Sequence, residues 1–423
     1  MGITSRINHA LQWVGIRSAP ATLQPSVLKV GAALPVSQIT LKHMIASYSP
    51  AALRAVVDHL KVEGRESDAG VTGYIRQRAS DGSPGALCVF LDGFREVIPL
   101  GDQHGNKTML NYLINRFGLE LHAGLKRLVS LGDIKDTETG NLRDMKSSYE
   151  LFKATVMMKF YFPETFHPLL GNHDVVFPGV KDLETAKSIV RFIITQGEKA
   201  VIDEADTNGY LRTLERLGLG QEIVLVKENE NQTTKVVQGI EYLKYVVFQL
   251  KGEGMNEEAI ARELMAQQEF FDNSPLTAVV LGKDELTFLS HAGFIRGGIS
   301  NLGDLIDARL SPDVTHQLLW NRFDNNDREN SENKPDRVRA ADVNAMVNGL
   351  ASIFNIDGYK VNMILGHRPG SAWSMELIPK VKQIKINHAN IVRHTKYPSY
   401  GFTTINGNGH PSEEYINTTT IAA

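Results

Sequence analysis

Five short segments of the chain combine glycine with side chains that bind divalent metal ions. They are GDQHG at 101–105, GDIKD at 132–136, GNHD at 171–174, SHAG at 290–293 and GHRPG at 366–370. Carboxylates, imidazoles and amide oxygens are ligands of hard and borderline cations, and no thiolate is present among them. Each segment follows an apolar run, and its glycine allows a sharp turn there. One such segment alone is typical of a turn, whereas five in this arrangement predict a shared metal site.

The apolar runs before these segments have the length of β-strands. Helix-length stretches, KTMLNYLINRFG and MKSSYELFKATVMMKFYF, separate the runs REVIPL, LKRLVSL and TFHPLL. The resulting order β-α-β-α-β predicts the α/β fold class. Ligands of open α/β sheets collect where the strands end. We therefore expect the five segments to meet at one edge of the strands.

The remaining patterns suggest how the chain is divided. We expect an N-terminal arm and helical cap over 1–80, where SPAALRAVVDHL begins with a Ser and a Pro suited to a helix start. The stretch 180–273 is mainly helical in pattern and predicts an insertion. We assign the catalytic core to 81–179 and 274–410 and a tail to 411–423.

Composition excludes several classes of protein. The chain has 423 residues, with 45 basic and 48 acidic side chains and a net charge of -3, so no nucleic-acid partner is indicated. No apolar run is long enough for a membrane span. The single cysteine, Cys88, lies in the apolar run ALCVFL and is expected to be an inert core thiol. The lack of disulfides favours a reducing compartment such as the cytosol.

The segments resemble those of the calcineurin-like metallophosphoesterases, and within them the phosphoprotein phosphatase (PPP) family. FYFPETFHPLLGNHD is similar to the family's approach to its GNHE motif, and HQLLW is similar to its LLW segment. The resemblance implies a metallophosphatase core, in which helices flank a central β-sandwich. It also implies a set of metal ligands. Asp102 and His104 bind the first ion, Asp133 bridges the two ions, and Asn172, His291 and His367 bind the second.

Physical chemistry favours the same assignment. Two divalent cations about 3.5–4 Å apart can hold a bridging hydroxide and aim it in line at phosphorus. A carboxylate between two such charges is needed, and Asp133 suits this role. His173 is then the candidate general acid for the leaving group, and the resemblance pairs it with Asp136. Manganese is the leading candidate metal, with iron, zinc and magnesium as alternatives.

The sequence departs from the family at the phosphate clamp. The family continues its second motif as GDxxDRG, whereas Thr137 follows Asp136 here. A guanidinium can bind phosphate oxygens bidentately, so another arginine is expected to contribute. The candidates are Arg322, Arg337, Arg339 and Arg368.

A PPP-like core with a helical insertion resembles secreted bacterial effector phosphatases of the WipA kind. This resemblance implies a phosphoprotein substrate in a host cell and favours phosphotyrosine, and the insertion is a candidate docking site for a partner. Three alternatives stay open from the sequence. They are a Ser/Thr phosphoprotein phosphatase, a phosphodiesterase or dinucleotide polyphosphate hydrolase, and a non-catalytic binding scaffold.

Overall fold

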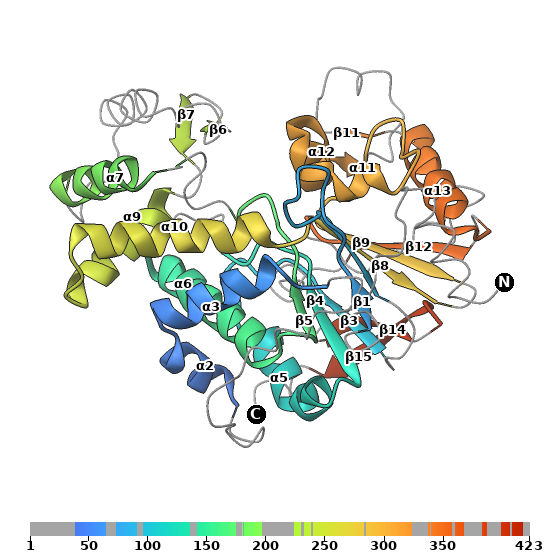
Figure 1. The fold of residues 1–423 in the computed structure, drawn as a ribbon, viewed down its shortest axis with the longest axis horizontal. Coiled ribbons are helices and arrows are strands. Elements are labelled where there is room, and N and C mark those ends of the chain that lie inside the picture. Colours follow the sequence, from blue (N-terminus) through green and yellow to red (C-terminus); the bar gives the residue numbers. More distant parts are fainter. Residues whose placement is uncertain are drawn as a thin grey trace.

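Figure 1 presents the computed structural model of the chain. The structure describes residues 39–64, 73–90, 96–135, 142–174, 180, 182–196, 224–229, 232–237, 240–282, 285–323, 337–338, 340–357, 360–367, 383–386, 399–406 and 408–417. Within these residues, no helix combines the length and apolar character needed to cross a membrane.

A six-stranded sheet forms one half of the core. Its strands, in spatial order, are β1 (Tyr74–Ile75), β2 (Leu87–Phe90), β8 (Thr277–Leu281), β9 (Leu286–Ser290), β12 (Val361–Leu365) and β13 (Gln383–Ile386). β8 and β9 form an antiparallel pair, while β12 runs parallel to β9 and to β13. The central strands are buried on both faces, which explains their continuous apolar sequence.

A five-stranded sheet forms the other half. Its strands, in spatial order, are β15 (Pro411–Asn417), β14 (Ser399–Asn406), β3 (Glu96–Leu100), β4 (Lys126–Ser130) and β5 (Phe166–Pro168). β3, β4 and β5 are parallel, and the connections between them contain α5 (Thr108–His122) and α6 (Leu142–Tyr161), as the sequence predicts. Strand β15 lies in the stretch expected to be a tail. It pairs with β14 over its whole length, so backbone pairing gives this polar segment its structure.

The two sheets pack face to face. One apolar cluster draws on both sheets, with Cys88 and Ala278 from the six-stranded sheet and Val97, Val129 and Ile405 from the five-stranded sheet. This arrangement is a β-sandwich with helices around it, so the predicted α/β fold class with a central sandwich is confirmed (Figure 1). Cys88 is fully buried in this cluster, and burial raises the pKa of its thiol to about 12, as expected for an inert thiol.

Helices from the N-terminal part and from the predicted insertion pack together beside the sandwich. The N-terminal helices are α2 (Leu41–Ser47) and α3 (Pro50–Leu60), and the Ser49 side chain caps α3 by accepting from the N–H of Ala52. The predicted insertion contains α7 (Leu183–Gln196), α9 (Ile240–Gly252), α10 (Glu257–Asn273) and the hairpin of β6 (Val224–Asn229) and β7 (Gln232–Val237). α10 packs on α3 and on α7, and α9 packs on α6 (Figure 1).

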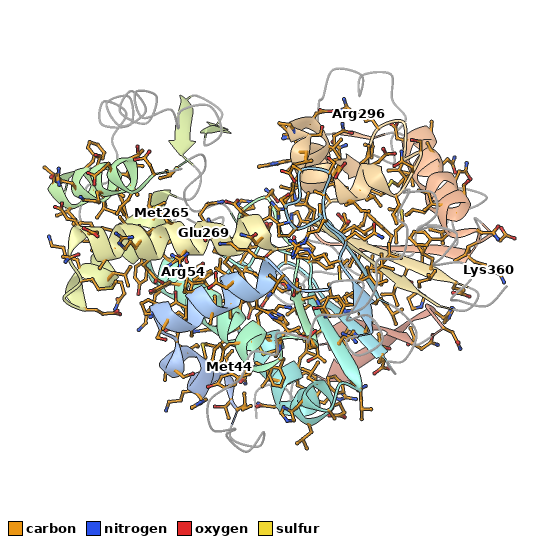
Figure 2. The ribbon with its side chains drawn as sticks, in the orientation of Figure 1. Met44, Arg54, Met265, Glu269, Arg296 and Lys360 are labelled. Carbon is orange, nitrogen blue, oxygen red and sulfur yellow. The ribbon has the colours of Figure 1, made fainter. Side chains whose placement is uncertain are left out.

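Ion pairs at the α3–α10 contact lie at the surface. Arg54 of α3 and Glu269 of α10 are side by side in Figure 2, with 3.0 Å between Nη1 and Oε2. Lys61 approaches the same carboxylate at 3.0 Å.

The last group of elements follows β9 and precedes β12 in the chain. It consists of α11 (Gly303–Ile306), a 3₁₀ turn (Ala308–Leu310), α12 (Pro312–Trp320), β10 (Arg322–Phe323), β11 (Arg337–Val338) and α13 (Ala340–Phe354). α12 follows the helix-start rule, because Ser311 caps it and Pro312 occupies its first turn.

Candidate metal centre

The segments predicted from the sequence lie at strand ends, and the fold brings them together. β3, β4 and β5 are parallel, so the loops that carry Asp102, Asp133 and Asn172 leave the sheet at one edge. His291 directly follows β9, and His367 lies two residues beyond β12, which is parallel to β9. Ligands from both sheets of the sandwich therefore meet at the carboxyl ends of their strands.

Close backbone approach explains why glycines accompany these ligands. A Cβ on Gly366 would lie 2.1 Å from Asp102 Oδ1, and a Cβ on Gly171 would lie 2.2 Å from the backbone nitrogen of Asp133. No side-chain atom fits at such distances, so any other residue would push the loops apart. The glycines thus set the spacing between the loops in addition to allowing the turns.

Three of the expected ligands have left-handed backbone conformations. The φ angle is 41° at His104, 49° at Asp133 and 66° at His367. These conformations are uncommon outside glycine, cost conformational energy and cluster at functional sites. Backbone hydrogen bonds hold two of the loops together, because the N–H groups of Gln103 and His104 donate to the carbonyl of Asp133 at 3.1 and 2.8 Å.

Asp133 belongs to two overlapping groups of metal-ligating atoms. One group contains Asp102, His104 and Asp133, and the other contains Asp133, His291 and His367, with the ligand atoms of each group within 4.8 Å of one another. Asp133 Oδ2 lies 3.5 Å from His104 Nε2 and 3.4 Å from His291 Nε2. One carboxylate therefore faces both groups, as expected for a bridging ligand.

Asn172 joins the second of these groups. Its Oδ1 lies 2.6 Å from His291 Nε2 and 2.9 Å from His367 Nδ1, and these two nitrogens are 3.1 Å apart. The Nδ1 of His291 lies 3.0 Å from the carbonyl of Leu131. Because a carbonyl only accepts, we place the imidazole proton on Nδ1, which leaves the Nε2 lone pair available for a metal ion.

The electrostatics of the cluster suit a cation. Burial and the nearby Asp133 charge raise the pKa of Asp102 well above its usual range. Burial also opposes ionisation of Asp133, but His291, His173 and His104 outweigh it and lower the pKa of this carboxyl. Burial lowers the pKa of His291, so its imidazole stays neutral, as a metal ligand must.

The residues present fit two divalent metal ions. The donors are carboxylate oxygens, an amide oxygen and imidazole nitrogens, which suit manganese, iron, zinc and magnesium. Two buried carboxylates that face each other are unfavourable alone, and bound cations reverse this repulsion. The Gly366 contact with Asp102 leaves no room for a side chain that would displace a ligand. The structure therefore places all six expected ligands in one cluster of suitable chemistry.

His173, the expected general acid, lies at the edge of this cluster. Its backbone N–H donates to Asp133 Oδ1 at 2.9 Å. Its ring packs edge-on against the His104 ring, with the ring centroids 5.2 Å apart. The side chain is partly exposed, so a substrate can reach it. Its expected partner, Asp136, lies outside the described residues.

The backbone places two of the four candidate phosphate-binding arginines side by side. Arg322 of β10 and Arg337 of β11 are register partners in a parallel pair that follows α12. Arg339 and Arg368 lie outside the described residues. The backbone pairing thus brings Arg337 beside Arg322, which lies two residues after Trp320.

Sequence reasoning did not single out four further residues around the cluster. The Trp320 ring lies 6.5 Å from the His173 ring and 6.1 Å from the His367 ring, centroid to centroid, and His316 stacks on it at 5.9 Å. Asp174 and Lys135 are fully buried, and each lies two residues after an expected ligand, Asn172 and Asp133 respectively. The HQLLW, GNHD and GDIKD patterns contain all four residues, but no spacing rule shows what a side chain faces after folding.

Comparison with known proteins adds little at the sequence level. No protein-family profile matches the chain, and no curated protein matches it. Among solved structures, the chain is similar to a protein described as a serine/threonine phosphatase from Saccharomyces cerevisiae with similarity to human phosphatase PP5. The identity is 11%, the TM-score is 0.42, and the match covers 90% of each chain.

Proposed function

We propose that this protein is a metal-dependent phosphatase of the calcineurin-like PPP type that hydrolyses phosphomonoesters on proteins. The observation that carries the proposal is the pair of ligand groups that share Asp133. Asp102 and His104 would hold one ion, with Asn172, His291 and His367 around the other. Manganese is the metal we would load first, and iron, zinc and magnesium suit the same donors.

Two divalent cations at this site would bind phosphoryl oxygens and activate a water for attack. The chain's own residues would position the substrate and move protons. His173 is partly exposed beside the ligands, so its imidazole can protonate the leaving oxygen. Its backbone N–H bond to Asp133 keeps it next to the site, and Asp136 would orient its ring. Arg322 and Arg337, joined by their strand pairing, are the leading candidates to bind phosphate.

We further propose that phosphotyrosine is the preferred substrate. The Trp320 ring supplies an aromatic surface within ring-contact distance of His173 and His367. Aromatic pairs contribute about 0.5–1.5 kcal/mol beyond the area that they bury. An aryl leaving group can use this surface, whereas a serine or threonine side chain has no ring to stack. A place of action inside a host cell stays a prediction from the sequence resemblance.

The test is phosphate release from matched phosphotyrosine, phosphoserine and phosphothreonine peptides by full-length protein, stripped of metal and reloaded with manganese. We expect kcat/KM for phosphotyrosine to exceed the other two by about tenfold or more. Trp320→Leu should narrow this ratio, mainly by lowering the phosphotyrosine rate. Asp102→Ala serves as the blank, because it removes a ligand of the first ion.

Each alternative function predicts a different result in the same assay. Faster release from phosphoserine or phosphothreonine would make the protein a Ser/Thr phosphatase. Faster hydrolysis of bis(p-nitrophenyl) phosphate than of p-nitrophenyl phosphate would identify a phosphodiesterase. Full metal occupancy with no turnover on any of these compounds would contradict catalysis and favour a binding scaffold.

A further inference from the structure

A lysine next to the ligand loops is fully buried, although burial is unfavourable for a charged ammonium group. Lys135 is two residues beyond Asp133 and has no exposed surface. Burial of an ammonium group costs several kcal/mol unless other groups stabilise it. The neighbours of Lys135 are therefore the groups that could stabilise its ammonium charge.

The first neighbour is the carboxylate of Asp174, which is also fully buried. Burial and the Asp133 charge raise the pKa of Asp174 to about 7, and the Lys135 charge opposes this rise. Asp174 in turn connects two ligand loops, because its Oδ1 accepts from the N–H of Ile134 at 2.8 Å and its Oδ2 accepts from the N–H of Gly171 at 2.9 Å. The N–H of Lys135 donates to the same Oδ1 at 3.3 Å. Asp174 thus ties the loop of Asp133 to the loop of Asn172.

These two loops touch backbone to backbone, so small movements matter. A Cβ on Gly132 would lie 2.3 Å from the nitrogen of Gly171. Any change that loosens Asp174 would shift Asp133 relative to Asn172. A displacement of about 1 Å at a catalytic centre can cost about a hundredfold in rate.

The second neighbour of Lys135 comes from the predicted insertion. The Lys135 Nζ lies 5.0 Å from the centre of the Tyr242 ring, on α9, which is the range of a cation–π contact. Tyr242 is fully buried, and its hydroxyl donates to Gln267 Oε1 of α10 at 3.3 Å. Gln267 donates to Glu263 one turn earlier, at 3.3 Å. Contacts therefore run from the ligand loops into two helices of the predicted insertion, α9 and α10.

We propose that Lys135 is a positioning residue of the metal centre and that α9 of the insertion holds it in place through Tyr242. The inference rests on the proposed function only in taking Asp133 and Asn172 as metal ligands. Lys135 acts through Asp174 and makes no contact with substrate. The insertion is then a structural part of the metal centre, in addition to any docking role.

The test measures manganese binding to metal-stripped, full-length protein by calorimetry, with the electron paramagnetic resonance signal of a spin-coupled manganese pair as a second readout. Lys135→Met keeps a long apolar side chain and removes the charge. We expect it to weaken manganese binding by about 10–100-fold, the usual cost of losing a group behind the ligands. Tyr242→Leu should shift the affinity in the same direction, while both proteins keep a cooperative thermal transition.

Tyr245→Leu is the matched control, because Tyr245 lies on the same helix and its ring contacts Tyr149 at 6.2 Å. It should leave manganese affinity within about twofold of the wild type, since it removes packing and spares the Lys135 contact. Equal losses in Tyr242→Leu and Tyr245→Leu would mean a general loosening of α9 and would overturn the proposal. A folded Lys135→Met protein with wild-type affinity and an intact pair signal would overturn it too.

The binding assay separates this inference from the proposed function. If the wild type binds two manganese ions but releases no phosphate from any peptide, the phosphatase proposal fails while the Lys135 comparison still stands. If Lys135→Met does not fold, Tyr242→Leu carries the test, and its wild-type affinity would contradict the role of α9. A wild type that binds no manganese would overturn both.

Discussion

His173 illustrates how much of the candidate chemistry depends on single side chains. Its backbone is held by a 2.9 Å hydrogen bond to Asp133, while its ring stays partly exposed beside His104. A metal ligand would have to turn its ring nitrogen into the buried cluster, as His291 does. Under the proposed function, this partly exposed position is the one in which His173 would donate a proton to the leaving group.

Replacing His173 with alanine should therefore separate catalysis from metal binding. We expect kcat on phosphopeptides to fall by about 10²–10⁴-fold, the usual contribution of a general acid. Manganese affinity should hardly change, because the backbone bond to Asp133 and all six expected ligands remain. Steady-state kinetics with parallel calorimetry checks both statements. Undiminished turnover would remove His173 from the mechanism, and a loss of bound metal would make it a structural residue.

Among single residues, the sequence predicts the candidate metal ligands better than the buried residues that contact their loops. Asp102, His104 and Asp133 were recognisable because glycine and a strand accompany each of them. Asp174 and Lys135 occur in the same motifs, but their roles depend on which backbone N–H groups and rings lie close after folding. Those contacts join segments that are far apart in the chain, so local sequence patterns cannot predict them.

At the scale of elements, α3 is attached to the core by a buried ionic group. The Glu63 carboxylate, just after α3, pairs with Lys159 of α6 at 2.6 Å and with Arg76 at 3.0 Å, and all three side chains are almost completely buried. Lys159 also donates to the carbonyl of Phe166, at the start of β5. This contact joins α3 to the strand that leads into the GNHD loop.

Glu63→Gln should strongly destabilise the protein. It leaves Lys159 and Arg76 buried without a compensating carboxylate, which costs about 3–5 kcal/mol in the free energy of unfolding. Glu269→Gln is the matched control, since Glu269 also faces two cations at 3.0 Å, Arg54 and Lys61, but at the surface. Its cost should be about 0–1 kcal/mol. Urea denaturation measures the free energy of unfolding of both variants. Similar losses of stability would contradict the expected difference between the buried and the surface ion pairs.

The sequence predicted regular elements with strong periodicity and missed those that depend on pairing. β3, α5, β4, α6 and β5 follow from apolar runs and helical spacing, because each buries a continuous face. The β6–β7 hairpin and β15 have weaker apolar patterns and pair with a neighbouring strand along their length. Strand pairing of this kind leaves a weak signal in the sequence, so local patterns predict a mainly helical stretch over 180–273 and a tail over 411–423.

For the molecule as a whole, the sandwich holds the two halves of the candidate metal centre together. Ligands on β3, β4 and β5 loops come from one sheet, and His291 and His367 come from the other. Any loss of packing between the sheets therefore separates ligand groups that must share Asp133. Titratable side chains buried within this packing can make the free energy of unfolding depend on pH.

His167 on β5 is such a side chain. It is buried between the rings of Tyr74 and Phe90, with ring centroids 4.6 and 4.7 Å away. Burial lowers the pKa of His167 well below its ordinary value, and the charges of Lys159 and Arg127 lower it further. The imidazole is therefore neutral in the folded protein and free to take a proton only after unfolding.

The direction of the pH effect follows from this difference. Below the ordinary histidine pKa of about 6.5, the unfolded chain binds a proton at His167 that the folded protein does not, so acid favours unfolding. This residue alone should lower the free energy of unfolding by about 1.4 kcal/mol per pH unit between roughly pH 6 and the depressed folded pKa, with little effect above pH 7.

His167→Phe keeps a ring between the two aromatic neighbours and removes the proton site. Urea denaturation of metal-free protein at pH 7.5, 6.5 and 5.5, three points chosen to bracket about pH 6.5, should show a shallower acid dependence in the variant. The comparison at pH 7.5 measures the packing cost alone, and parallel pH dependences in the two proteins would show that His167 is not the group that responds.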